Sequence, residues 1–194
     1  MSNIDIIKSN FQENQKINSI SSSQILESID MATSKILSMI DSSGKLLTCG
    51  NGGSSGDAQH IASEFINRFE SERKPLPAIS LNSDTATLTS IANDYGYQYV
   101  FSKQIKAIGN PDDILMVFTT SGNSINILDA IVSAKDKNIP IILVSGDNGG
   151  KACALLDQND IKILVPSTRT SRIQEMHLVI IHSICECIDM HLAK

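Results

Sequence analysis

The stretch DILMVFTTSGNS, residues 113–124, decides the fold of this chain because it joins a buried strand to a polar loop. Its apolar run Ile114–Phe118 has no polar face, which predicts a strand covered on both sides, as in a parallel sheet. Hydroxyl side chains gather around a glycine where that strand ends. The stretch therefore predicts a parallel α/β protein with a ligand-binding loop at the carboxyl end of one strand.

The same alternation of a short apolar run and a longer helical stretch extends over residues 44–194. Connections between parallel strands are almost always right-handed and place helices on both faces of the sheet. We therefore predict a three-layer α/β/α sandwich of the flavodoxin type, with residues 73–77 as an exposed connection. Its five parallel strands are KLLTCG (45–50), PAISL (77–81), DILMVFTT (113–120), IPIILVSG (139–146) and IKILVP (161–166).

Residues 1–43 predict helices that precede this core. Ser21 to Ser23 offer N-caps for the main helix, and an earlier helix is expected over about residues 5–15. A chain of 194 residues suits one domain, so we expect a single unit over residues 1–194. The apolar residues of the main helix recur at three- and four-residue spacing: Ile25, Ile29, Ala32, Ile36 and Ile40.

Composition excludes several classes of partner. The net charge is -5 with no cluster of Lys or Arg, which argues against a broad nucleic-acid surface. The longest apolar runs fall far short of the roughly 18 residues that a membrane span needs. The first 15 residues lack the basic end and long apolar run of a secretion signal. We therefore expect a cytoplasmic protein with no nucleic-acid or membrane partner.

Two glycine-rich segments follow predicted strands. In GNGGSSGDAQH (50–60), small residues let the backbone approach a ligand at the start of a helix, although such a turn is often purely structural. It is not a dinucleotide fingerprint, because Ser55 stands where the third glycine is required. The segment SGDNGGKA (145–152) is not a nucleotide P-loop, because Ser145 and Ala152 replace essential residues.

The loop TTSGNS (119–124) presents four hydroxyl groups just before a predicted helix. Hydroxyls and helix N-H groups bind a phosphate monoester without any lysine, and an ordinary helix cap is the alternative interpretation. The hydroxyls belong to Thr119, Thr120, Ser121 and Ser124.

His60 and Glu64 stand four residues apart in a predicted helix, so both side chains lie on one face. This spacing suits metal binding or acid-base catalysis, but an exposed pair without function has the same spacing. His182 lies in an apolar stretch and can equally be a core or interface histidine, while His177 and His191 are interpreted as structural.

Gln174 and His182 are the other polar residues of interest in the last predicted helix, eight residues apart. They are separated by about 12 Å on a straight helix. One metal ion therefore reaches both only if the helix is irregular or another subunit contributes.

Several motifs taken together resemble the phosphoheptose isomerases of the sugar isomerase (SIS) family. The resemblance covers nearly the whole chain, from the N-terminal helices to the last one. It rests on GNGGSSGDAQHIASEFINRF, IANDYGYQYVFSKQ, TTSGNS, VPSTRTSRIQEMH and the IIH that ends at His182.

The resemblance implies conversion of sedoheptulose 7-phosphate to D-glycero-D-manno-heptose 7-phosphate, for lipopolysaccharide heptose supply. It also implies a zinc-dependent homotetramer that uses residues 1–43 in packing and oligomerisation. The implied zinc ligands are His60, Glu64, Gln174 and His182. The implied substrate contacts are Asn51, Gly52, Gly53, Glu64, Asn93, Asp94, Thr119, Thr120, Ser121, Ser124 and Gln174. Thr119 stands where serine is common, and Ser171 where some members have an acidic residue.

The same resemblance makes Glu64 the catalytic base and His182 the catalytic acid of an enediol mechanism. A carboxylate held firmly by zinc is a poor base, so Glu64 must shift its coordination or is not a full ligand.

Two alternatives remain from the sequence. One is a noncatalytic SIS tetramer that assembles a replication initiator and shares the RIQEMH region, but is expected to lack histidine at position 182. The other is an SIS isomerase for a different sugar phosphate.

Overall fold

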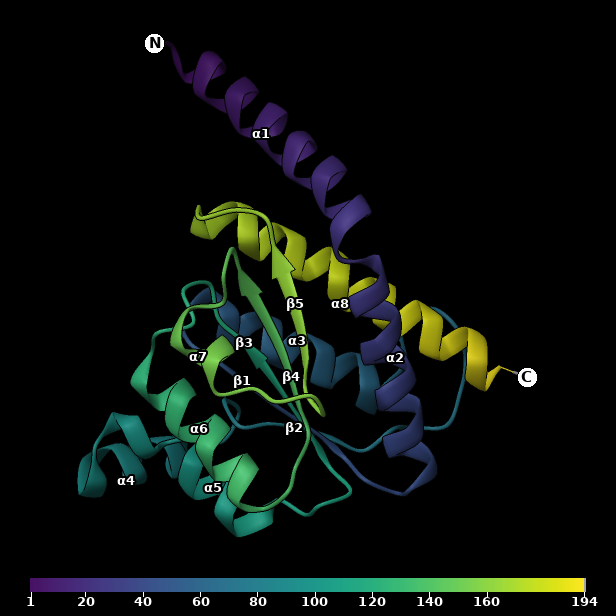
Figure 1. The fold of residues 1–194 in the computed structure, drawn as a ribbon, viewed down its shortest axis with the longest axis vertical. Coiled ribbons are helices and arrows are strands. Elements are labelled where there is room, and N and C mark those ends of the chain that lie inside the picture. The colour runs from purple at the N-terminus through teal and green to yellow at the C-terminus, as the bar shows by residue number, and fades with distance from the viewer. Residues whose placement is uncertain (194) are drawn as a thin grey trace.

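A computed structural model describes residues 1–193 as a parallel sheet between two layers of helices (Figure 1). The strands are β1 (Leu46–Gly50), β2 (Ala78–Ser80), β3 (Ile114–Phe118), β4 (Ile141–Gly146) and β5 (Ile161–Val165). The helices are α1 (Asn3–Gln24), α2 (Leu26–Asp41), α3 (Gly53–Ile66), α4 (Thr85–Tyr95), the 3-10 helix η1 (Tyr97–Tyr99), α5 (Ser102–Ile108), α6 (Ile125–Asp136), α7 (Gly150–Ala154) and α8 (Thr170–Leu192).

The sheet has the order β2-β1-β3-β4-β5, and every neighbouring pair is parallel. Successive side chains of β3 point to opposite faces because a strand has a two-residue period. Met116 and Phe118 therefore join the core under α2, α3 and α8, while Leu115 and Val117 join the core under α5, α6 and α7. The predicted three-layer sandwich with five parallel strands is confirmed.

The N-terminal helices begin and end at other residues than predicted. Ser2 caps α1 by accepting a hydrogen bond from the Asp5 N-H, and α1 continues to Gln24. Ser22 and Ser23 donate their hydroxyls to carbonyls three residues earlier, so they extend α1. The prediction that Ser21 to Ser23 cap the main helix is therefore wrong, and α2 begins after Ile25 without a side-chain cap.

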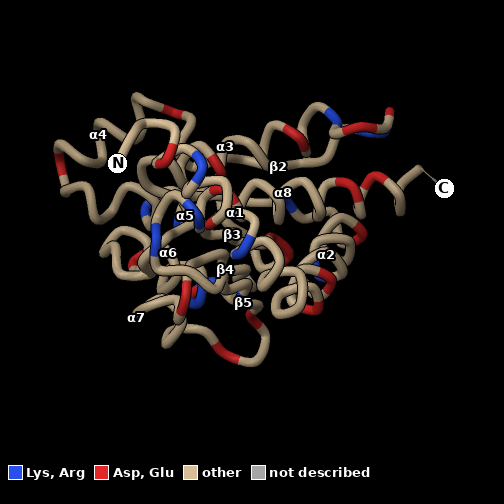
Figure 2. Tube along the Cα trace, turned by 90° about the horizontal axis from the view of Figure 1, so that it is seen from above, with Lys and Arg blue, Asp and Glu red and all other residues tan. Residues whose placement is uncertain are grey.

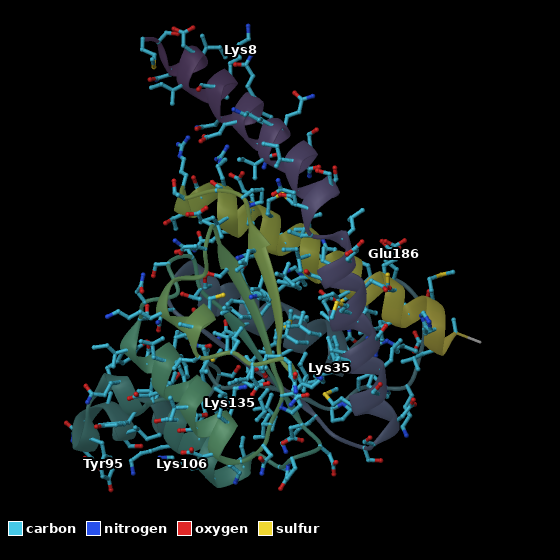
Figure 3. The ribbon with its side chains drawn as sticks, viewed as in Figure 1. Lys8, Lys35, Tyr95, Lys106, Lys135 and Glu186 are labelled. Atoms are coloured by element: carbon cyan, nitrogen blue, oxygen red, sulfur yellow. The ribbon has the colours of Figure 1, made fainter. Side chains whose placement is uncertain are left out.

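Helix α1 extends away from the rest of the molecule (Figure 1). Its second half crosses the start of α8, where the Asn14 side chain donates to Glu175 at 2.6 Å. In its first half, Asn10 and Glu13 also accept hydrogen bonds from Arg169 and Arg172 at the start of α8. Nearer the N-terminus, side chains such as that of Lys8 project into open space (Figure 3). One apolar stripe of this half is exposed, formed by Ile4, Ile7 and Phe11.

Lys and Arg residues are interspersed with Asp and Glu residues along the chain and do not gather on one element (Figure 2). This distribution agrees with the absence of a Lys/Arg cluster in the sequence. Within residues 1–193, no helix has the length and apolar character needed to cross a membrane.

A buried ion pair joins the connection after α3 to the end of α8. Arg73 Nε lies 2.7 Å from Asp189 Oδ1, and the two side chains are only 2% and 3% exposed. Asp189 also accepts hydrogen bonds from the N-H groups of Glu70 and Ser71. The prediction that residues 73–77 form an exposed connection is therefore wrong at Arg73, because its guanidinium has buried partners on two helices.

Arg73 also stabilises the end of α3. Its Nη2 donates to the Glu64 carbonyl at 2.8 Å, and its Nη1 donates to the Phe65 carbonyl at 3.1 Å. The last carbonyls of a helix have no partner within the helix. Arg73 supplies a partner for the Glu64 carbonyl and shares the Phe65 carbonyl with the Leu76 N-H. The ion pair thus fixes the position of α3 relative to α8.

The Asp189→Asn substitution should destabilise the protein, because it keeps the shape of the side chain but leaves the Arg73 charge uncompensated. Loss of one partner of a buried ion pair costs about 3–5 kcal/mol in the free energy of unfolding. Urea denaturation at pH 7 and fixed protein concentration measures this difference. The matched control is Glu72→Gln in the exposed Arg68–Glu72 pair, which should cost no more than about 1 kcal/mol.

The cost of Asp189→Asn should depend on pH. Burial acts to raise the pKa of Asp189, but hydrogen bonds from the Ser71 N-H, the Arg73 guanidinium and the Glu70 N-H outweigh it, so the pKa is lowered. A lowered folded-state pKa gives stability that is present above the unfolded-state pKa and is lost as pH falls through the folded-state value. The difference between wild type and variant should therefore narrow below about pH 4. A difference that stays constant down to acid unfolding would contradict this assignment.

Candidate active site

The candidate site lies where the strand order of the sheet reverses. After β1 the chain builds one edge of the sheet through β2, and after β3 it builds the other edge through β4 and β5. In a sheet of this order the loops after β1 and β3 diverge, and a ligand crevice is expected between them at the carboxyl ends of these neighbouring strands. They belong to two segments predicted from the sequence: the hydroxyl loop (residues 119–124) and the glycine-rich loop (residues 50–60), of which residues 53–60 form the first turns of α3.

The hydroxyl loop contains one hydroxyl that shapes it and another that is free. Thr119 is buried, and its Oγ1 accepts a hydrogen bond from the Gly122 N-H at 3.2 Å. Ser124 occupies the N-cap position of α6, but its side chain makes no capping hydrogen bond. The alternative interpretation of this loop as an ordinary side-chain cap therefore fails at Ser124. Its hydroxyl is available beside the unpaired N-H groups of the first helical turn, where an anion binds.

The other two predicted phosphate contacts complete the loop. Ser121 is exposed, and its hydroxyl accepts a hydrogen bond from the Asn123 N-H at 3.3 Å. Thr120 is half-buried at the carboxyl end of β3. Both follow the end of β3 and stand three or four residues before Ser124.

The segment 145–152 supports the hydroxyl loop from behind. Gly122 has a φ of +63°, and a Cβ atom there would lie 1.8 Å from the Gly149 carbonyl oxygen. The Ala152 N-H donates to the Gly122 carbonyl at 2.9 Å. The glycines that resembled a P-loop thus allow two loop backbones to pack closely, which holds the hydroxyl loop in one conformation.

The glycine-rich loop is equally tightly packed. Gly52 has a φ of +56°, which favours glycine, and it precedes the first residue of α3. Gly53 lies directly against Gln174 of α8, because a Cβ atom on Gly53 would lie 2.4 Å from Gln174 Nε2. The structure therefore brings Gln174 to the start of α3.

A second group of site residues lies further along α3. His60 Nε2 and Glu64 Oε1 are 3.2 Å apart, with side chains 30% and 22% exposed. The His182 ring meets the His60 ring edge-on at 5.1 Å between centroids and stacks on Phe69 at 5.4 Å. The acid, base and metal candidates His60, Glu64 and His182 thus form one group, which we call the His-Glu-His group.

His182 is exposed on α8, so the alternative interpretation as a core histidine is wrong. The core position belongs to His177, which is fully buried and hydrogen-bonds Asp57 through Nδ1 at 3.0 Å. This buried contact joins α8 to α3 and agrees with a structural His177. Helical spacing alone did not tell which histidine faced the sheet, because both lie among isoleucines.

The thiol nearest to the His-Glu-His group is inert. Burial raises the pKa of Cys185 to about 12, and the negative charge of Glu64 adds to the shift. The thiol therefore stays protonated at neutral pH and is a poor nucleophile.

Asn93 and Asp94 lie near the end of α4. The Asn93 amide donates to the Asp94 carboxylate at 2.9 Å, and Asp94 lines a cavity of about 480 Å³ between β2, α4 and α5. No residue of the hydroxyl loop or of the His-Glu-His group lines that cavity. No side-chain hydrogen bond within the described residues joins these two predicted substrate contacts to the hydroxyl loop or the His-Glu-His group.

Gln174 and His182 stay far apart because they lie on one uninterrupted helix. Helix α8 is continuous from Thr170 to Leu192, so helix irregularity does not bring the two side chains together. In the part of the chain that the structure describes, no three His, Cys, Asp or Glu side chains converge as a ready-made metal site. A site that used all four predicted zinc ligands would therefore need a second subunit.

Three further residues contact the predicted site residues, and the sequence did not single them out. Asn126 exchanges two hydrogen bonds with Asn51, Tyr97 donates its hydroxyl to Asn51, and Phe69 stacks on His182. None of them follows a predicted strand directly. Only Asn126 could have been recognised from the sequence, because it is a polar residue in the first helical turn after the hydroxyl loop.

Comparisons with known proteins assign the family. Residues 11–146 match the family described as SIS domain. A phosphoheptose isomerase from Alteromonas mediterranea is 47% identical over 186 residues, which is 96% of this chain and 94% of the relative. The chain belongs to the phosphoheptose isomerases of the SIS domain family.

Solved structures of phosphoheptose isomerases have the same fold over almost the whole chain. The enzyme GmhA from Neisseria gonorrhoeae has a TM-score of 0.93 at 38% identity, covering 97% of this chain and 100% of its own. The phosphoheptose isomerase from Francisella tularensis has a TM-score of 0.95 at 41% identity, covering 98% and 100%. The resemblance inferred from the sequence motifs is therefore confirmed.

Proposed function

We propose that this protein isomerises D-sedoheptulose 7-phosphate to D-glycero-D-manno-heptose 7-phosphate. One observation carries the proposal: α3 and α8 bring Glu64 together with two imidazoles, His60 and His182, in a phosphoheptose isomerase fold. A carboxylate and an imidazole are the acid-base pair that an aldose-ketose exchange needs. We further propose that the reaction is cytoplasmic and supplies heptose for lipopolysaccharide.

The proton transfers follow from these side chains. Glu64 removes a proton from C1 of the ketose, which gives an enediol, and returns that proton to C2 to form the aldose. His182 donates a proton to the C2 oxygen and accepts one from the C1 hydroxyl, so that protons balance over the cycle. The hydroxyl loop holds the phosphate through Ser124 and the N-H groups of α6, which fixes the other end of the substrate.

We also propose one zinc ion per subunit, held by His60, Glu64 and His182 of one protomer and Gln174 of a second. Imidazoles and carboxylates are donor types that bind zinc, and His60, Glu64 and His182 lie in one group, although within the described residues they do not converge as a ready-made site. When bound, zinc would polarise the carbonyl and enediolate oxygens. Glu64 would act as the base only while its carboxylate is not fully engaged as a ligand.

A homotetramer is the assembly that we propose, with α1 in an interface between copies. The stripe of Ile4, Ile7 and Phe11 lies on one side of α1, and Phe11 is 75% exposed. An apolar stripe on a helix that projects from the body suits burial against another copy. Assembly would also bring Asn93, Asp94 and Gln174 of one copy to the His-Glu-His group of another.

The direct test of the function is NMR of sedoheptulose 7-phosphate incubated with the protein, with and without a chelator. We expect anomeric aldose signals to appear with zinc and to be suppressed by the chelator. Aldose signals absent under both conditions would favour a noncatalytic scaffold instead.

The Glu64→Gln substitution should lower turnover by about 10²–10⁴, because the amide keeps the size of the side chain but cannot accept the C1 proton. Circular dichroism and thermal unfolding should match wild type. The control is Glu186→Gln, at an exposed carboxylate of α8 that projects from the same helix as His182 (Figure 3). Turnover by Glu64→Gln within a factor of ten of wild type would exclude Glu64 as the base.

Metal analysis by mass spectrometry should find about one zinc per chain in the purified protein, as tetrahedral sites bind it tightly. His60→Ala and His182→Ala should each lower the zinc content, while His191→Ala at an exposed position of α8 should not. Full zinc occupancy in both site variants would contradict the proposed ligands, whatever their activity.

The Phe11→Asp substitution should weaken the tetramer, because it places a charge within the exposed apolar stripe of α1. Light scattering coupled to size-exclusion chromatography should show a smaller mass for this variant. The control is Ser9→Asp, at an exposed position on the opposite side of the same helix. A variant that keeps the mass of four chains would exclude this stripe from the interface.

A further inference from the structure

The glycine-rich loop and the hydroxyl loop are joined by a reciprocal amide pair. Asn51 Nδ2 donates to Asn126 Oδ1 at 2.9 Å, and Asn126 Nδ2 donates to Asn51 Oδ1 at 2.8 Å. Asn51 follows β1, whereas Asn126 lies in the first turn of α6 after β3. The pair therefore spans the crevice at the point where the strand order reverses, the usual place for a ligand in such sheets.

Asn126 is the buried member of this pair and lies on a packed helix. It is only 4% exposed, and the helix that carries it packs into the core under β3 and β4. A buried side-chain amide costs free energy unless its donors and acceptor find partners. Asn51 is one of those partners, so its amide is tied to a rigid helix.

Tyr97 makes the third hydrogen bond to the same amide. Its hydroxyl donates to Asn51 Oδ1 at 3.3 Å, although its side chain is otherwise largely open and the residue is 57% exposed. Gly96, with a φ of +104°, turns the chain from α4 into η1 and so directs Tyr97 toward the loop. Within residues 1–193 the Tyr97 hydroxyl has no other hydrogen bond, so the Asn51 contact is what holds it at the crevice.

These contacts leave one hydrogen-bonding position of the Asn51 amide free. An amide has two acceptor and two donor positions. Oδ1 accepts from Asn126 and Tyr97, and Nδ2 uses one N-H on Asn126. One N-H of Asn51 therefore remains for a ligand in the crevice, in an orientation set by its three bonds.

We infer that Tyr97 is a positioning residue for substrate binding, which acts by holding the Asn51 amide. The inference rests on the proposed function, and it concerns affinity for the sugar phosphate and not the proton transfers of the His-Glu-His group. One neutral hydrogen bond contributes about 0.5–1.5 kcal/mol, which corresponds to about 2- to 12-fold in affinity.

The test is a double-mutant cycle with Tyr97→Phe and Asn51→Ala, assayed with sedoheptulose 7-phosphate. Tyr97→Phe removes only the hydroxyl, and we expect KM to rise about 3- to 10-fold with kcat within twofold of wild type. Asn51→Ala should raise KM further. In that background Tyr97→Phe should change KM by less than about 1.5-fold, because the atom through which it acts is gone.

The matched control is Tyr99→Phe, in the same 3-10 helix but without a contact to Asn51. It should leave KM and kcat unchanged, and thermal unfolding should be the same for both tyrosine variants. A KM within 1.5-fold of wild type for Tyr97→Phe would overturn the inference. The inference would also be overturned if Tyr97→Phe changed KM by the same factor in wild type and in Asn51→Ala, because Tyr97 would then act independently of Asn51.

Failure of the proposed function gives a different result from failure of this inference. A wild-type protein that binds the sugar phosphate without isomerising it would overturn the activity alone. The same cycle is then measured from dissociation constants by calorimetry, with the same expected fold-changes and the same criteria for rejection. A wild-type protein that does not bind sedoheptulose 7-phosphate at all would overturn both.

Discussion

Burial of both faces of a parallel sheet is the constraint on which the rest of this structure depends. Parallel strands need crossover connections, and the helices in these connections cover both faces of the sheet. Because all five strands run in the same direction, their carboxyl ends lie at one edge of the sheet. The glycine-rich and hydroxyl loops therefore reach the same crevice, although they lie far apart in the sequence. Their conformations are then fixed by close backbone packing, at Gly53 against Gln174 and at Gly122 against Gly149.

The contact between α3 and α8 brings the candidate acid-base residues together. The buried Arg73–Asp189 pair fixes the end of α3, including the carbonyl of Glu64, while the Asp57–His177 contact fixes its first half. With α3 held in this way, Glu64 and His182 lie on neighbouring surfaces of two rigid helices. Catalytic groups on helices that are packed in this way lose little further freedom when substrate binds.

One protomer contains the parts of the site in separate places. The crevice holds the loops and Gln174, the His-Glu-His group lies further along α3, and Asp94 lies beside a cavity at the edge of the sheet. Because α8 is a continuous helix, bending does not bring Gln174 to His182. The proposed tetramer is the simplest way to unite these parts, and the exposed stripe on α1 gives it a surface on which to form.

The sequence by itself determined the order of strands and helices, the polar loops and the family. An apolar run such as Ile114–Phe118 predicts a buried strand from its composition alone. The loops are recognisable because glycine, serine, threonine and asparagine have definite backbone and hydrogen-bonding preferences. Only the tertiary structure decided that His182 faces His60 while His177 faces the core, and that Asn51 meets Asn126 and Tyr97. The physical reason is that such contacts join residues 46, 75 or 120 positions apart, and their geometry depends on how whole helices pack, which no local periodicity encodes.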